Sequence, residues 1–93
     1  MRRRILIVED DRTLRQALTF NLEREGYEVR GAVDGQQALD WARTDQFDLM
    51  LLDVMLPGMS GIEVLRVLRS EGIGTPVIVL SAKGDEIDRV VGL

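Results

Sequence analysis

Carboxylate side chains follow two short apolar runs of this 93-residue sequence. Residues 9–11 (Glu-Asp-Asp) come directly after residues 5–8 (Ile-Leu-Ile-Val), and Asp53 comes directly after residues 49–52 (Leu-Met-Leu-Leu). Short continuous apolar runs are typical of strands that are buried on both faces of a sheet. If both strands end at the same edge, their acids meet where open α/β sheets bind ligands. We therefore expect one acidic pocket at that edge.

The chemistry of such a pocket follows from its donor atoms. Crowded carboxylates repel one another, and either a raised pKa or a bound cation relieves the repulsion. The sequence contains no His and no Cys, and oxygen ligands alone favour Mg2+ or Mn2+ over zinc. A cation beside Asp53 would shield an incoming phosphate, so that the Asp53 carboxylate could attack a phosphoryl group. Ser81, which follows the apolar run at residues 77–80, could donate a hydrogen bond to the phosphoryl oxygens.

Strand and helix patterns alternate along the chain and would position these residues. We predict strands at residues 5–8, 27–30, 47–52 and 77–80. We predict helices at residues 12–25, after Asp34 and after Ser60, and the first turns of a fourth helix at residues 86–91. Alternation of this kind implies an α/β fold, a doubly wound parallel sheet with right-handed crossovers and helices on both faces.

Capping residues support the helix starts. Asp11 and Asp34 are each placed to cap a helix, and Ser60 with Glu63 forms a capping box. In the first helix, Leu14, Ala17, Leu18 and Leu22 recur at helical spacing and predict its inner stripe.

Bulk composition excludes several classes of protein. The chain is long enough for one domain, and its net charge of -4 does not provide the broad basic surface of a nucleic-acid-binding protein. No apolar stretch reaches the length of a membrane span, and the N-terminus does not read as a signal peptide. We expect a cytoplasmic protein without direct contact to membrane or nucleic acid.

Three motifs, in order, resemble the response-regulator receiver domain of two-component systems. They are residues 8–11, Asp53 with residues 55–61 (Met-Leu-Pro-Gly-Met-Ser-Gly), and residues 80–83 (Leu-Ser-Ala-Lys). The tail is similar to the transcription-factor branch with winged-helix outputs. The resemblance implies a single receiver domain over residues 1–93, with a flavodoxin-like fold and sheet order 2-1-3-4. It also implies that the chain ends within the fourth helix, with the family's fifth strand and fifth helix absent.

The resemblance assigns the phosphoryl chemistry to named residues. Asp53 would be the phosphoacceptor, and the donor would be a phosphohistidine on a sensor histidine kinase. Ser81 would turn toward the phosphoryl group, and Ala82 would be small so that its backbone can approach. Pro57 and Gly61 would shape the loop under the site.

The resemblance also implies a Mg2+ cofactor and a signalling role. Asp10, Asp53 and the backbone carbonyl of Met55 would bind the metal directly, and Glu9 would reach it through water. The chain would be a switch rather than an enzyme, controlling a DNA-binding output and thereby transcription. The resemblance allows a homodimer of receivers.

Departures from the family leave alternatives open. The fifth strand would carry a lysine and an aromatic residue for the readout, and Lys83 is not that lysine. The chain could therefore be a truncated or engineered receiver fragment that keeps the acidic pocket without signalling. In that case residues 77–80 would form an open apolar edge, prone to strand exchange or dimerisation.

Two enzyme or cofactor-binding alternatives fit less well. A haloacid-dehalogenase-like phosphatase places a second Asp two positions after its nucleophile, where this chain has Met55. A dinucleotide-binding domain would need a G-x-G-x-x-G motif after the first strand, and none is present.

Overall fold

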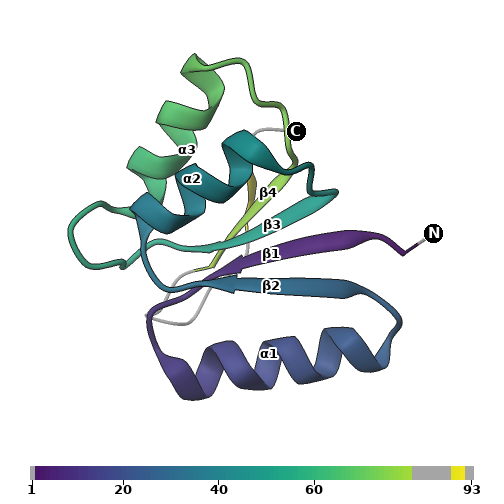
Figure 1. The fold of residues 1–93 in the computed structure, drawn as a ribbon. Coiled ribbons are helices and arrows are strands. Elements are labelled where there is room, and N and C mark those ends of the chain that lie inside the picture. The colour runs from purple at the N-terminus through teal and green to yellow at the C-terminus, as the bar shows by residue number, and fades with distance from the viewer. Residues whose placement is uncertain (1, 81–88, 92–93) are drawn as a thin grey trace.

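The computed structural model describes residues 2–80 and 89–91, which form one twisted sheet with helices on both faces (Figure 1). The strands are β1 (Arg4–Val8), β2 (Glu28–Ala32), β3 (Leu49–Asp53), β4 (Val77–Leu80) and β5 (Arg89–Val91). Their order across the sheet is β2-β1-β3-β4-β5, and the first four are parallel. The predicted α/β class and the order 2-1-3-4 are confirmed. Because these four strands are parallel, their carboxyl ends meet at one edge.

The helices of the described residues are α1 (Arg12–Arg24), α2 (Gly35–Thr44) and α3 (Gly61–Ser70). The predicted caps are confirmed: Asp11, Asp34 and Ser60 each accept a hydrogen bond from a backbone N–H in the first turn of the helix that follows. Figure 1 shows α1 on one face of the sheet and α2 with α3 on the other. Because β1 ends at Val8 and α1 begins at Arg12, the start of α1 lies next to the acids that follow β1.

The two faces of the sheet are covered to different extents. The α2–α3 face carries a closed core that includes Leu6, Met50, Leu52, Val64 and Leu68, all with 0% exposure. On the other face, within the described chain, no residue of α1 is buried. This difference limits how rigidly α1 is held by packing alone.

The stripe predicted for α1 needs a correction. Leu18 and Leu22 are half-buried against the sheet, as expected. Leu14, however, is 44% exposed, and Ala17 is exposed as well. The reason is lateral placement: α1 contacts β1 and β2, so the flank of the helix that carries Leu14 and Ala17 has no described element over it.

The prediction of a helix over residues 86–91 is wrong at residues 89–91, and residues 86–88 lie outside the described chain. Residues 89–91 form β5, which pairs antiparallel with β4, with Val77 opposite Val91 and Val79 opposite Arg89. An unpaired row of N–H and C=O groups at a sheet edge is costly and favours strand addition. β5 supplies hydrogen-bond partners for that edge, which the alternative of a receiver fragment leaves open.

Within the described residues, no helix has the length and apolar character needed to cross a membrane.

Candidate functional site

The acidic residues at the carboxyl ends of β1 and β3 come together at one edge of the sheet. One carboxylate oxygen each from Glu9, Asp10 and Asp53 lies within 4.8 Å of the others. The strand register explains this arrangement. Val8 of β1 pairs with Leu52 of β3, and in each strand the next residue is an acid, Glu9 or Asp53. The acids expected to meet at one edge of the sheet are therefore close together.

Asp53 is the last residue of β3 and is 5% exposed. It pairs with Leu80, the last residue of β4. Its Oδ1 accepts a hydrogen bond from the Met55 N–H at 3.1 Å. This bond limits rotation of the carboxylate and brings the Met55 backbone against the acid, while the Met55 side chain is 58% exposed.

Gly61 allows α3 to begin directly against Asp53. A Cβ atom at this position would collide with the Asp53 carbonyl oxygen and would lie 3.0 Å from Val54 Cα. The Gly61 N–H donates to the Val54 carbonyl at 2.9 Å. The family resemblance implies only that Gly61 helps to shape the loop, because a close backbone approach leaves no local pattern in the sequence.

Glu9 is a buried carboxyl group, 5% exposed. The pKa of Glu9 is raised from 4.5 to about 7, first by burial and then by the neighbouring Asp53 and Asp10 carboxylates, against the lowering effect of the Asp11 backbone hydrogen bond. That hydrogen bond runs from the Asp11 N–H to Glu9 Oε2 at 3.0 Å. Burial and the two neighbouring carboxylates both disfavour a charged Glu9, and a bound cation would offset both effects.

Asp10 is the exposed member of the group, and Arg15 holds the backbone that carries it. The Arg15 guanidinium donates from Nη1 to the Glu9 carbonyl at 2.7 Å and to the Asp10 carbonyl at 3.4 Å. Sequence reasoning missed Arg15, although its position one helical turn after the Asp11 cap was a usable signal.

The donor set fits Mg2+. Three carboxylates at one sheet edge supply hard oxygen ligands, which this ion prefers, and the ion commonly binds through one or two carboxylates and keeps several waters. Glu9, Asp10 and Asp53 are brought together as predicted, and Met55 lies beside them. Ser81 and Ala82, predicted to contact the phosphoryl group, lie outside the described residues, as does Lys83.

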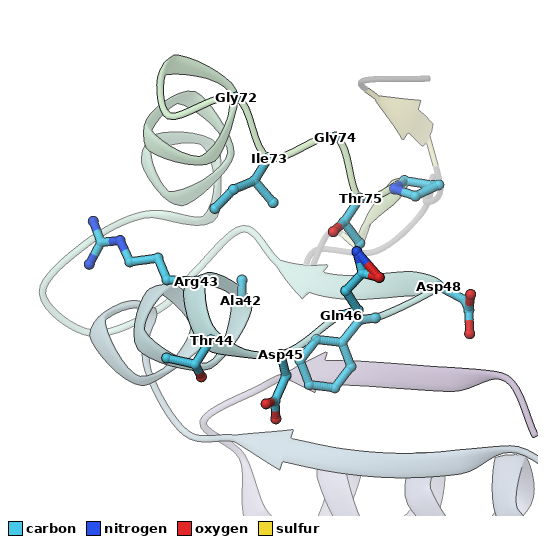
Figure 2. A pocket seen from close by; sticks show the side chains of 12 residues that line it. Ala42, Arg43, Thr44, Asp45, Gln46, Asp48, Gly72, Ile73, Gly74 and Thr75 are labelled. Carbon is cyan, nitrogen blue, oxygen red and sulfur yellow. The ribbon is translucent and has the colours of Figure 1, made fainter.

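A cavity lies at the opposite, amino end of the sheet (Figure 2). It has a volume of about 680 Å3 and is lined by the α2–β3 and α3–β4 loops. The charged groups around it already have partners: Arg43 pairs with Glu71 at 2.6 Å, and Arg69 donates to the carbonyls of Ile73 and Thr75. The acidic edge, whose charges are unbalanced, is therefore the stronger candidate site.

Comparison with known proteins agrees with this geometry. The family described as the response regulator receiver domain matches residues 5–93. The chain is 46% identical over its full length to the alkaline phosphatase synthesis transcriptional regulatory protein PhoP of Bacillus subtilis, covering 39% of that protein. It is 50% identical over its full length to the DNA-binding response regulator MtrA of Mycobacterium tuberculosis, covering 40% of that protein. The chain thus spans about two fifths of the length of these curated relatives.

Solved structures show the same fold. The receiver domain of the Francisella response regulator 1452 superposes with a TM-score of 0.84 at 35% identity, over 89% of this chain and 69% of that chain. Response regulator TrrA from Thermotoga maritima, solved in complex with Mg2+-BeF, superposes with a TM-score of 0.82 at 38% identity, over 86% of this chain and 70% of that chain. With its parallel sheet, its acidic edge and a family match over residues 5–93, this chain belongs to the response regulator receiver domain family of two-component systems.

Proposed function

We propose that this chain is the phosphoacceptor switch of a two-component system, in which Asp53 receives a phosphoryl group from a sensor histidine kinase. The observation that carries the proposal is the meeting of Glu9, Asp10 and Asp53 within 4.8 Å at the carboxyl edge of the sheet. A carboxylate and a phosphate repel each other unless a cation compensates their negative charges. The neighbouring acids could hold that cation.

The chain's own residues prepare the transfer. An Asp53 carboxylate oxygen attacks phosphorus, an O–P bond forms, and the P–N bond to the donor imidazole breaks. The imidazole leaves with the bonding electron pair and takes a proton from solvent. The Met55 N–H holds Oδ1 and so fixes the orientation of the carboxylate for attack. Because Asp53 is modified once per transfer, we propose an acceptor protein rather than an enzyme.

Asp10, Asp53 and the Met55 carbonyl would hold Mg2+, with Glu9 reaching it through water. When bound, the ion supplies positive charge that stabilises the transferring phosphoryl group. Ser81 and the backbone at Ala82 would donate hydrogen bonds to the phosphoryl oxygens.

The names of the relatives support the output. PhoP is a transcriptional regulatory protein and MtrA a DNA-binding response regulator. We therefore propose that phosphorylation of Asp53 controls a DNA-binding output and thereby transcription, with a receiver homodimer as one form of the active state.

A small phosphodonor with Mg2+ tests the acceptor role directly. The wild type should gain one phosphoryl mass that is labile to base and maps to Asp53. Asp53→Asn should gain none, whereas the exposed α2 control Asp40→Asn should behave as the wild type. A wild type that gains no mass would refute the proposal.

A second candidate is a receiver that accepts the phosphoryl group without transmitting it. In that case phosphorylation would shift NMR resonances around Asp53 but leave those of β4 and β5 unchanged. A transmitting switch would move both sets.

A further inference from the structure

Arg15 ties the loop between β1 and α1 to the edge of the sheet. It leaves the first turns of α1, and its guanidinium reaches back to the carbonyls of Glu9 and Asp10 at 2.7 and 3.4 Å. Both carbonyls belong to residues whose carboxylates form the acidic site. Arg15 therefore contacts the backbone of the site without touching its carboxylates.

Gly31 in β2 makes room for the stem of Arg15. A Cβ atom on Gly31 would lie 3.0 Å from Arg15 Cδ and 3.2 Å from Cγ. The Arg15 stem is thus laid flat across β2, and its head is fixed by the carbonyls. A long side chain held at both its stem and its head can fix a loop that packing leaves free, and α1 itself has no buried residue within the described chain.

We propose that Arg15 is a positioning residue for the Mg2+ site, holding the backbone of Glu9 and Asp10 so that their carboxylates face the position of the cation. This inference rests on the proposed function, because it concerns the same site. Supporting groups behind metal ligands commonly change metal affinity by about 10- to 100-fold.

The charge of Arg15 and its positioning contact should have opposite effects on Mg2+ affinity. A fixed positive charge beside a cation site repels the cation, so removal of the charge alone would strengthen Mg2+ binding. Loss of a positioning contact would instead weaken binding, because the ligands must be ordered when the metal arrives. The sign of the change therefore separates the two roles.

Mg2+ titration of the whole chain by calorimetry or NMR is the first test. Arg15→Gln should weaken Mg2+ binding about tenfold. The control is Arg12→Gln, which removes a positive charge from an exposed position on the same helix and should leave the affinity unchanged or slightly stronger. Unchanged or tighter binding in Arg15→Gln would overturn the proposal.

Gly31→Ala perturbs the same contact without any change of charge. In the wild-type background it should displace the Arg15 stem and weaken Mg2+ binding severalfold. In an Arg15→Ala background there is no stem to displace, so Gly31→Ala should have no effect on affinity. Equal weakening in both backgrounds would show that the contact is not the cause.

Amide hydrogen exchange in metal-free protein gives a readout that does not depend on Mg2+. The Asp11 N–H is protected by Glu9 Oε2, so Arg15→Gln should speed its exchange by about tenfold or more, while the buried Leu68 in α3 exchanges at the wild-type rate. Equal acceleration at Leu68, or none at Asp11, would count against positioning. If the wild type fails to bind Mg2+, the proposed function fails, and this measurement still decides the role of Arg15.

Discussion

The two ends of the sheet treat charge in opposite ways. At the amino end, Asp45 lies 3.1 Å from Arg30 and 3.5 Å from Arg4, and Arg4 also pairs with Glu28. At the carboxyl end, Glu9, Asp10 and Asp53 gather without an ion pair to any described residue. One end has balanced charges, and the other has an excess of negative charge.

Aromatic rings strengthen the contrast. At the amino end, the Arg4 guanidinium stacks over Phe47 at 4.8 Å and the Arg30 guanidinium over Trp41 at 3.9 Å, an arrangement that stabilises the folded chain. At the carboxyl end, the pKa of Glu9 is raised to about 7. The difference teaches that the fold balances its charges at the amino end, where they stabilise it, and leaves them unbalanced at the carboxyl end, where the candidate site lies.

The largest expected effect on stability comes from adding a Cβ atom where two backbone segments touch at the acidic edge. Gly61→Ala should lower the free energy of unfolding by about 3 kcal/mol, because the new Cβ collides with the backbone of Asp53 and Val54. Urea unfolding measures the change. Gly74→Ala, at a glycine of the amino-end loop with nothing within 4 Å of the added Cβ, is the control and should be nearly neutral.

Removing charge at the acidic edge should stabilise the metal-free protein. Because the pKa of folded Glu9, about 7, lies above its ordinary 4.5, the folded state binds this proton more tightly. The free energy of unfolding should then fall as pH rises from about 4.5 to about 7. Glu9→Gln should remove this slope and gain about 2 kcal/mol at about pH 8.

Urea unfolding of metal-free protein at about pH 5 and about pH 8 checks this sign. Glu23→Gln, an exposed acid on α1, should leave the slope as in the wild type. If Glu9→Gln destabilises the protein at the higher pH, the negative charge of Glu9 does not destabilise the folded state.

Bound Mg2+ should reduce the difference in charge balance between the two ends of the sheet, because it neutralises negative charge at the carboxyl end. At a concentration about tenfold above its Kd, the ion should raise the free energy of unfolding by about 1.4 kcal/mol. Asp10→Asn should lose this gain, whereas Asp40→Asn should keep it. Thermal unfolding with and without Mg2+ measures both, and a wild type that gains nothing at millimolar metal would exclude a functional Mg2+ site.

The smallest effect is expected at the amino end, and with the opposite sign to that of Glu9→Gln. Asp45→Asn should cost about 0.5 kcal/mol, since exposed ion pairs contribute little. The loss should shrink in concentrated salt, which screens the pairs with Arg4 and Arg30. If Asp45→Asn stabilises the protein, the ion pairs at the amino end do not contribute to stability, and the two ends do not differ in the way proposed.

Much of the fold could be predicted from local patterns. β4 has the predicted bounds, Val77–Leu80, and the caps Asp11, Asp34 and Ser60 act as expected. Apolar runs and capping residues act over a few positions, so they can be read along the chain. The order of the four parallel strands came from the family resemblance.

Other features depended on contacts between distant segments. β5 replaced a predicted helix because the open edge of β4 provides hydrogen-bond partners that local propensity does not register. The exposure of Leu14 and Ala17 depends on where α1 lies across the sheet. Helical spacing predicts which side chains share a face, but it does not say how much of that face is covered.

The candidate site divides in the same way. The sequence by itself determined which acids lie at the strand ends, and that Asp53 would be the single acid at the end of the most apolar strand. Only the tertiary structure decided that Glu9 is buried, that Gly61 admits α3 against Asp53, and that Arg15 holds the acidic loop across Gly31. The physical reason is that residue type and periodicity act locally, whereas burial, pKa and close approach arise when segments far apart in sequence pack together.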